Sequence, residues 1–144
     1  MNKVKALAAG IPLLGILDVS ITLSAQFFGY SLEKVEKGLF ASFFIKIGLL
    51  PLYIPIYLGF LTLISLLIIH LHKTNMQELT INKISRALAV MGLCVTYAIL
   101  TSIIIMNVLV LLCYEQIITK YLIIRMVIAV TSAITLMAIL RDEI

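Results

Sequence analysis

Four long apolar runs, separated by short polar segments, constrain the fold of this sequence more than any other feature. The runs cover residues 6–28, 39–71, 87–114 and 121–140, and a helix needs about 20 predominantly apolar residues to cross a bilayer. Only 12% of the residues are charged, and the segments between the runs are too short to hold a soluble domain. We therefore predict an all-α polytopic membrane protein, a single integral membrane domain of residues 1–144 with four transmembrane helices in an up-down bundle.

The second run, residues 39–71, is longer than one span requires. A straight helix of that length would measure about 50 Å, whereas the hydrocarbon core is about 30 Å thick. Pro51 and Pro55 each lack a backbone N–H and favour a kink. One interpretation is therefore a proline-kinked, tilted second helix. The other places residues 38–48 in the outer interface as an amphipathic helix, with the span running from about Leu49 to Ile69.

Lysine and arginine residues near the ends of the runs predict the orientation of the chain, because cytoplasmic loops carry an excess of them. The termini and the second connection carry Lys3, Lys5, Lys73, Lys83, Arg86 and Arg141, whereas the first and third connections carry Lys34, Lys37 and Lys120. The sequence thus predicts a multi-pass protein of the cell membrane with both termini in the cytoplasm. A virion membrane protein would show the same pattern.

Asp18 is the one acidic residue inside the first apolar run. An ionised carboxylate at the bilayer centre costs roughly 3 kcal/mol even on the most lenient insertion scale, so we expect it to have a partner. Lys46 lies at a similar depth if residues 39–71 form one helix, and we then predict an intramembrane salt bridge between the two side chains. If residues 38–48 lie in the interface instead, Lys46 extends to water and the pair does not form.

Three further polar residues are expected near this pair. Thr22 follows Asp18 by about one helical turn, Asn107 lies two turns before the end of the third run, and Arg125 lies one turn into the fourth. Asn107 is too deep to reach the headgroups, whereas Arg125 is close enough to a helix end to extend toward them. We predict an intramembrane polar cluster that contains Asp18, Lys46, Asn107, Thr22 and Arg125.

Small residues form a stripe along one face of the first run, and a second patch lies in the fourth run. In membranes such residues let helix backbones approach closely, because lipid provides no hydrophobic drive for helix association. We therefore predict helix packing at Gly15, Ala25, Gly29, Ala129 and Ala133. A substrate path is the alternative interpretation of these faces, but bundle packing is the more common use of small residues.

The sequence lacks catalytic and metal-binding motifs. Cys94 and Cys113 would lie about 28 Å apart on one helix, and His70 and His72 would point to different helix faces, which is wrong for chelation. No glycine-rich nucleotide loop, nucleophile elbow or EF-hand loop is present. The net charge of +4 is spread over several loops. We predict no enzymatic activity, no metal or other cofactor, and no nucleic-acid partner.

Several short motifs resemble an uncharacterised family of small prokaryotic multi-span membrane proteins. These motifs are Leu17-Asp18 followed by Thr22, Gly29, Glu33 and Glu36, then Lys46-Ile47-Gly48, and Tyr97 with Asn107. In that family an aspartate of the first span is followed by a hydroxyl residue, a glycine and an acidic loop, and a later span carries tyrosine and asparagine. The resemblance covers about the first three spans, and Lys37-Gly38 stands where the family pattern has Asn-Pro. It implies a fold type and a polar cluster, but no activity.

Two classes of function are compatible with these features. A non-catalytic structural or accessory subunit would act in the lipid bilayer through helix contacts with other membrane subunits or with further copies of itself, and the short connections favour this class. A small transporter, channel or proton-relay protein would use Asp18, Lys46 and Asn107, because ionisable groups within a membrane are commonly functional. The first class is our prediction and the second is the alternative.

Overall fold

The computed structural model of the chain describes residues 3–30, 39–73, 79–117 and 121–143. In chain order the elements are α1 (Lys3–Phe27), α3 (Leu39–Lys46), α4 (Leu50–Lys73), α5 (Leu79–Ile117), α6 (Tyr121–Leu140) and the short 3-10 helix η2 (Arg141–Glu143). Within these ranges every regular element is a helix and none is a strand. The prediction of an all-α chain is confirmed for the described residues.

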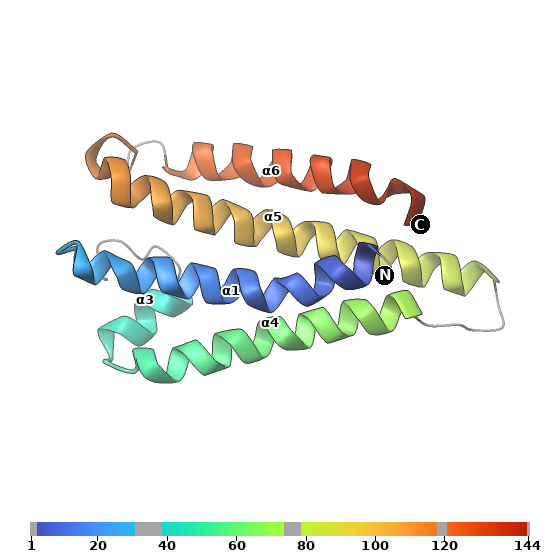
Figure 1. Ribbon diagram of the computed structural model, residues 1–144, viewed down its shortest axis with the longest axis horizontal. Coiled ribbons are helices and arrows are strands. Elements are labelled where there is room, and N and C mark those ends of the chain that lie inside the picture. The colour runs from blue at the N-terminus through green and yellow to red at the C-terminus, as the bar shows by residue number, and fades with distance from the viewer. Residues whose placement is uncertain (1–2, 31–38, 74–78, 118–120, 144) are drawn as a thin grey trace.

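Four of these helices are long and apolar enough to cross a membrane, as the sequence predicts. The spanning segments are Lys3–Ala25 in α1, Leu50–Lys73 in α4, Ile81–Leu112 in α5 and Leu122–Leu140 in α6. α5 has 39 residues and is therefore about 58 Å long, about twice the hydrocarbon thickness. Its first turns extend beyond the neighbouring ends of α1 and α4 (Figure 1), so the third helix begins well before residue 87.

The second apolar run does not form one proline-kinked helix, because a break at Gly48 divides it into α3 and α4. Gly48 has a φ angle of +71°, a left-handed conformation that glycine adopts without strain. Its N–H donates to the Ile45 carbonyl (3.1 Å), and the Leu49 N–H donates to the Phe44 carbonyl (2.9 Å). These are the hydrogen bonds of a Schellman C-cap. The helix boundaries therefore agree with the second interpretation, in which the span begins at about Leu49.

Both prolines of this run lie after the break, in the first two turns of α4. Pro51 is the second residue of the helix, where a backbone N–H would have no acceptor within the helix, so its loss is tolerated. The Leu49 carbonyl accepts from the N–H groups of Leu52 (3.0 Å) and Tyr53 (3.2 Å) and so starts the helical hydrogen bonding. Pro51 and Pro55 therefore mark the beginning of the span.

α1, α4 and α5 pack against one another at the centre of the molecule, whereas α6 packs mainly on α5. In Figure 1, α1 and α5 run in one direction and α4 and α6 run in the other, and the two chain ends lie at the same end of the helices. The shared core contains Val4, Ala8, Ile11, Leu61, Ile68, Val90, Leu93 and Cys94. The outer surface carries many exposed apolar side chains, as a surface that faces lipid does.

Pro12 interrupts the hydrogen bonding within α1, and side chains of the neighbouring helices compensate for it. Because Pro12 has no N–H, the Ala8 carbonyl four residues earlier loses its partner within the helix. The Ser65 hydroxyl of α4 donates to this carbonyl (2.7 Å), and the Tyr97 hydroxyl of α5 donates to the adjacent Leu7 carbonyl (2.7 Å). These bonds attach the first half of α1 to both of its central neighbours.

Candidate functional site

Asp18 lies in the middle of α1 and is buried between α4 and α5, with 8% of its surface exposed. The Tyr57 hydroxyl of α4 donates to its Oδ2 atom (3.0 Å). The Asn107 side-chain amide of α5 donates to its Oδ1 atom (2.9 Å). Burial of a carboxylate requires such partners in place of water. Asp18 therefore connects the three central helices through hydrogen bonds.

Asn107 also binds Thr22, which lies one turn after Asp18 on the same face of α1. The Asn107 side chain is 5% exposed, and its amide nitrogen donates to the Thr22 hydroxyl oxygen at 3.2 Å. The Asn107 amide of α5 thus donates hydrogen bonds to two side chains of α1. We call Asp18, Thr22, Tyr57 and Asn107 the polar network.

The predicted salt bridge between Asp18 and Lys46 is wrong. Lys46 is the last residue of α3 and is exposed, and no ion pair joins the two side chains in the described part of the chain. Because Gly48 separates α3 from α4, Lys46 does not continue into the span, so the depth expected for it along a single helix does not apply. Asp18 takes its hydrogen bonds from Tyr57 and Asn107 instead.

Arg125 of α6 lies near the polar network without joining it. Its side chain is partly exposed, and its charge interacts electrostatically with Asp18. Within the described ranges the two groups form no ion pair. Of the predicted cluster, the structure thus brings together Asp18, Thr22 and Asn107, places Arg125 at a distance and leaves Lys46 outside.

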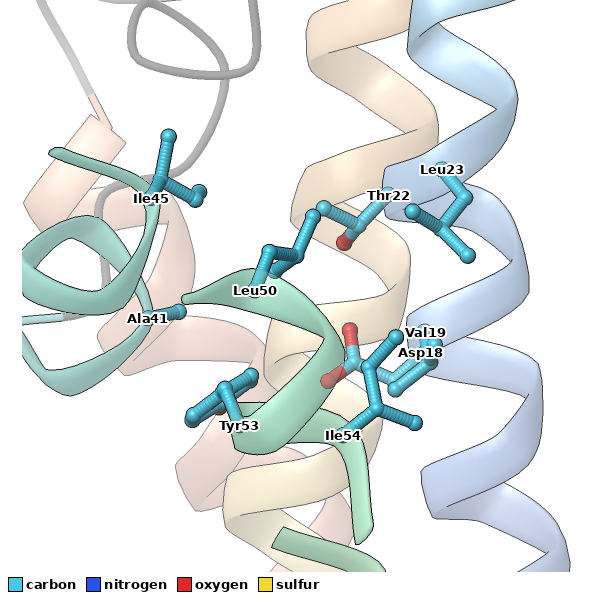
Figure 2. Close-up of a pocket in the computed structure, with 9 residues that line it drawn as sticks. All are labelled: Asp18, Val19, Thr22, Leu23, Ala41, Ile45, Leu50, Tyr53 and Ile54. Carbon is cyan, nitrogen blue, oxygen red and sulfur yellow. The ribbon is translucent and has the colours of Figure 1, made fainter. Parts of the chain in front are cut away.

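A cavity of about 20 Å³ lies beside the polar network. Figure 2 shows the oxygen atoms of Asp18 and Thr22 pointing from α1 toward the same space, opposite the first residues of α4. Leu50 and Tyr53 of α4 line the cavity, together with Ala41 of α3. α3 therefore covers the polar network from the side of the α3–α4 break.

An aromatic column connects α3 with Tyr57. The rings of Tyr53 and Tyr57 are stacked, with centroids 5.5 Å apart and an interplanar angle of 12°. The Phe44 ring of α3 lies 5.6 Å from that of Tyr53. Tyr57 is the member of the polar network that the sequence analysis missed. Its depth in the membrane could have identified it, because Tyr57 lies about two turns into a span that begins at Leu50.

Four of the predicted helix-packing residues lie at or near helix contacts. Gly15 and Ala25 of α1 are buried, and a Cβ atom at Gly15 would overlap the Leu61 side chain of α4. On α6, which packs on α5, Ala129 and Ala133 are half-buried.

The fifth residue, Gly29, has a different role. It lies beyond the end of α1, is exposed and has a φ angle of +79°. The following N–H, that of Tyr30, donates to the Ala25 carbonyl (3.0 Å), as in a Schellman C-cap. Because a Cβ at Gly29 would meet no atom within 4 Å, this glycine terminates the helix and does not pack against a neighbour.

The chemistry open to the polar network is hydrogen bonding and proton exchange. Cys94 is buried among apolar residues of the core, and the side chain of Cys113 lies outside what the structure describes. Among the described residues, no three His, Cys, Asp or Glu side chains gather closely enough to hold a metal ion.

Four apolar helices, with a polar network enclosed between three of them, define this chain as a multi-pass α-helical membrane protein. No protein-family model, curated protein or solved structure matches the chain. The family resemblance of the sequence motifs therefore stays a prediction. Any inference about function depends on the helix packing and the polar network themselves.

Proposed function

We propose that the chain is a non-catalytic structural or accessory subunit that acts in the membrane through helix contacts. The position of α6 is the observation that carries this proposal. Only 6% of the spanning window of α6 is buried, compared with 33% in α5, and α6 packs mainly on α5. A transmembrane helix held by one neighbour leaves most of its circumference to lipid or to another protein.

The outward face of α6 has the residue spacing of a helix–helix contact. Among the exposed apolar side chains of α6, one set recurs alternately four and three residues apart, the spacing of a seam between two packed helices. This set is Ile123, Val127, Val130, Ile134 and Met137, and Leu122, Met126 and Ile139 are exposed beside it. We assign this stripe, the α6 seam, to a transmembrane helix of another subunit or of a second copy of the chain.

A hydroxyl-rich groove lies between α5 and α6. Its volume is about 270 Å³, and its polar lining residues are Tyr97, Thr101, Thr131, Ser132 and Thr135. Hydroxyl groups within the bilayer hydrogen-bond across helix contacts in membrane proteins. The groove therefore adds polar recognition to the apolar contact that the α6 seam offers.

The polar network supports a structural role for the three central helices. Its members hydrogen-bond to one another across α1, α4 and α5, and Asp18 and Asn107 are almost fully enclosed. Each hydrogen bond of this kind between transmembrane helices stabilises the folded protein by about 0.6 kcal/mol on average and by up to about 1.7 kcal/mol. The network thus sets the geometry of the helices that present α6.

We also propose that both termini are cytoplasmic and that the chain lies in the cell membrane. The two chain ends share one end of the helices (Figure 1). The cations Lys73, at the end of α4, and Lys83 and Arg86, in the first turns of α5, lie at this same end, which is the distribution expected of the cytoplasmic side. Single cysteines in place of Lys34 and Lys73 would test this orientation, because labelling from the same side of the membrane contradicts it.

The assembly itself is tested by extracting native membranes into polymer-bounded lipid discs. We expect the tagged full chain in a discrete particle larger than a monomer, which Val130→Trp reduces to a monomer. Leu63→Trp is the matched control, because Leu63 is 66% exposed on α4 and Val130 is 58% exposed on α6. A monomeric wild-type particle, or equal loss with both variants, contradicts the role of the α6 seam.

The transport alternative is tested with the purified chain in liposomes. We expect no flux of ions or small solutes above that of empty vesicles, because the polar network is enclosed between three helices. Reproducible flux that Asp18→Asn abolishes would overturn the structural proposal and favour the transporter.

A further inference from the structure

The hydroxyl of Thr22 is used differently from those of the other threonines whose side chains the structure describes. In each of those the hydroxyl donates at 2.6–2.8 Å to the carbonyl four residues earlier. They are Thr62, Thr96, Thr101, Thr131 and Thr135. The Thr22 oxygen instead accepts a bond from Asn107. Among the described residues the Thr22 hydroxyl donates to no acceptor, so its hydrogen is available to a molecule in the adjacent cavity.

The carboxylate of Asp18 also has unused capacity. An ionised carboxylate can accept about four hydrogen bonds, and each oxygen of Asp18 accepts one, from Tyr57 and from Asn107. Asp18 and Thr22 both line the cavity, and their oxygen atoms point into the same space (Figure 2). A donor and an acceptor without further partners in the described structure thus share one small enclosure.

The size of the cavity matches one water molecule. A cavity needs roughly 10–15 Å³ of probe-occupied space and two to four polar partners to hold a water, and this one measures about 20 Å³. Most of the remaining lining is apolar: Val19, Leu23, Ala41, Ile45, Leu50 and Ile54. Tyr53 is the other lining residue with a polar group. A second water would therefore not have enough space.

We propose that this cavity binds one water molecule, which accepts a hydrogen bond from Thr22 and donates one to Asp18, and that Asp18 binds a proton through this water. In the protonation step the carboxylate gains one proton and one O–H bond, and the aqueous phase loses one proton. The water relays this proton, so no other reactant is needed. The proposal goes beyond the structural role and does not depend on a partner subunit.

The groups around Asp18 leave its negative charge without a direct counter-charge. The ionisable and polar groups on the neighbouring elements are Tyr53 and Tyr57 on α4, Asn107 on α5, Arg125 on α6 and Lys46 at the exposed end of α3. Neither cation forms an ion pair with Asp18 in the described residues. A carboxyl group in such surroundings is easiest to bury in its uncharged form.

Infrared spectroscopy of the full chain in lipid discs tests the proposal. We expect a carbonyl stretching band of a protonated carboxyl group that is missing in Asp18→Asn. The band should change in intensity with pH and shift when H₂O is replaced by D₂O. Absence of an exchangeable Asp18 band at every pH at which the chain stays folded would overturn the proposal.

Two variants test the role of the water. Ala41→Leu should fill the cavity and slow the H/D exchange of the Asp18 carboxyl by about tenfold or more, whereas Ala138→Leu, at an exposed site on α6, should leave exchange unchanged. Thr22→Val keeps the side-chain shape but removes the hydroxyl, so it should slow the H/D exchange of Asp18 in the same way. This variant tests the bridging water even if Ala41→Leu does not fold. Exchange at the wild-type rate in Thr22→Val would refute the bridging water.

A metal cation in the same cavity would have a different signature. At constant pH and ionic strength, replacing choline chloride by sodium or lithium chloride should leave the Asp18 band unchanged if the ligands are water and a proton. Loss of the band with either cation would assign the cavity to that cation and overturn the proposal.

Discussion

Gly15 and Gly59 form a matched pair of substitutions that measures how closely α1 approaches α4. A Cβ atom at Gly15 would overlap Cδ1 of Leu61 and lie 3.1 Å from Cδ2 of Leu58, whereas a Cβ at Gly59 would meet no atom within 4 Å. Leu61 is 4% exposed, so its side chain cannot turn away into lipid. The two glycines therefore differ mainly in their contact with the facing helix.

The expected magnitudes follow from two opposing effects. Replacing a helical glycine by alanine gains up to about 1 kcal/mol of helix propensity, so Gly59→Ala should stabilise the chain by up to that amount. Gly15→Ala gains the same propensity but overpacks the α1–α4 contact, which costs about 1–3 kcal/mol. The propensity gain cancels between the variants, so Gly15→Ala should be less stable than Gly59→Ala by about 1–3 kcal/mol, which is about 5- to 150-fold in the unfolding equilibrium.

Reversible unfolding of the full chain in mixed lipid–detergent micelles measures this difference. Sodium dodecyl sulfate is titrated into the micelles while far-ultraviolet circular dichroism reports the remaining helix. The wild-type chain provides the reference for both variants. If Gly15→Ala is as stable as Gly59→Ala, the close approach of α1 to α4 at Gly15 is refuted.

The same unfolding assay checks three further expectations. Tyr57→Phe removes a donor to Asp18 and should cost about 0.6–1.7 kcal/mol, and a stability equal to wild type would argue against that hydrogen bond. Ser65→Ala should cost a similar amount of stability, but less in a Pro12→Ala background, because alanine restores the N–H that Pro12 lacks. Equal costs in both backgrounds would show that Ser65 does not compensate for Pro12. Lys46→Met should change the free energy of unfolding by no more than about 0.5 kcal/mol, and its effect should add to that of Asp18→Asn in the double variant. Strong coupling between the two changes would instead support a salt bridge between Asp18 and Lys46.

The number of transmembrane helices could be predicted from the sequence because apolar length is the dominant constraint on a spanning segment. The same reasoning misplaced Lys46. Its depth was counted along one continuous helix. The C-cap at Gly48 ends α3, however, so depth in the second span has to be counted from Leu50, the first residue of α4. With that start, Tyr57 lies about 10 Å into the span and Asp18 lies about 13 Å from the end of α1 at Phe27. The corrected depth matches Tyr57 with Asp18.

The contact between Asp18 and Asn107 was partly accessible to sequence reasoning, because both residues are too deep in their spans to reach water and need polar partners. The placement of α6 was not accessible. All four spanning helices are strongly apolar, and lipid supplies no hydrophobic drive that would turn a particular face inward. Which helices touch therefore depends on local shape and a few hydrogen bonds, and the sequence pattern does not encode these as a periodic signal.

The proline in α1 also has a consequence for biogenesis. α1 leaves the ribosome before α4 does. It contains a carbonyl, that of Ala8, which loses its intrahelical partner to Pro12 and obtains one from Ser65, 57 residues later in the chain. In hydrocarbon an unsatisfied backbone group costs several kcal/mol. We therefore expect α1 alone to insert into the bilayer less favourably than it does together with α4. During synthesis it should stay beside the insertion machinery until α4 emerges, so that the two helices enter the bilayer as a pair.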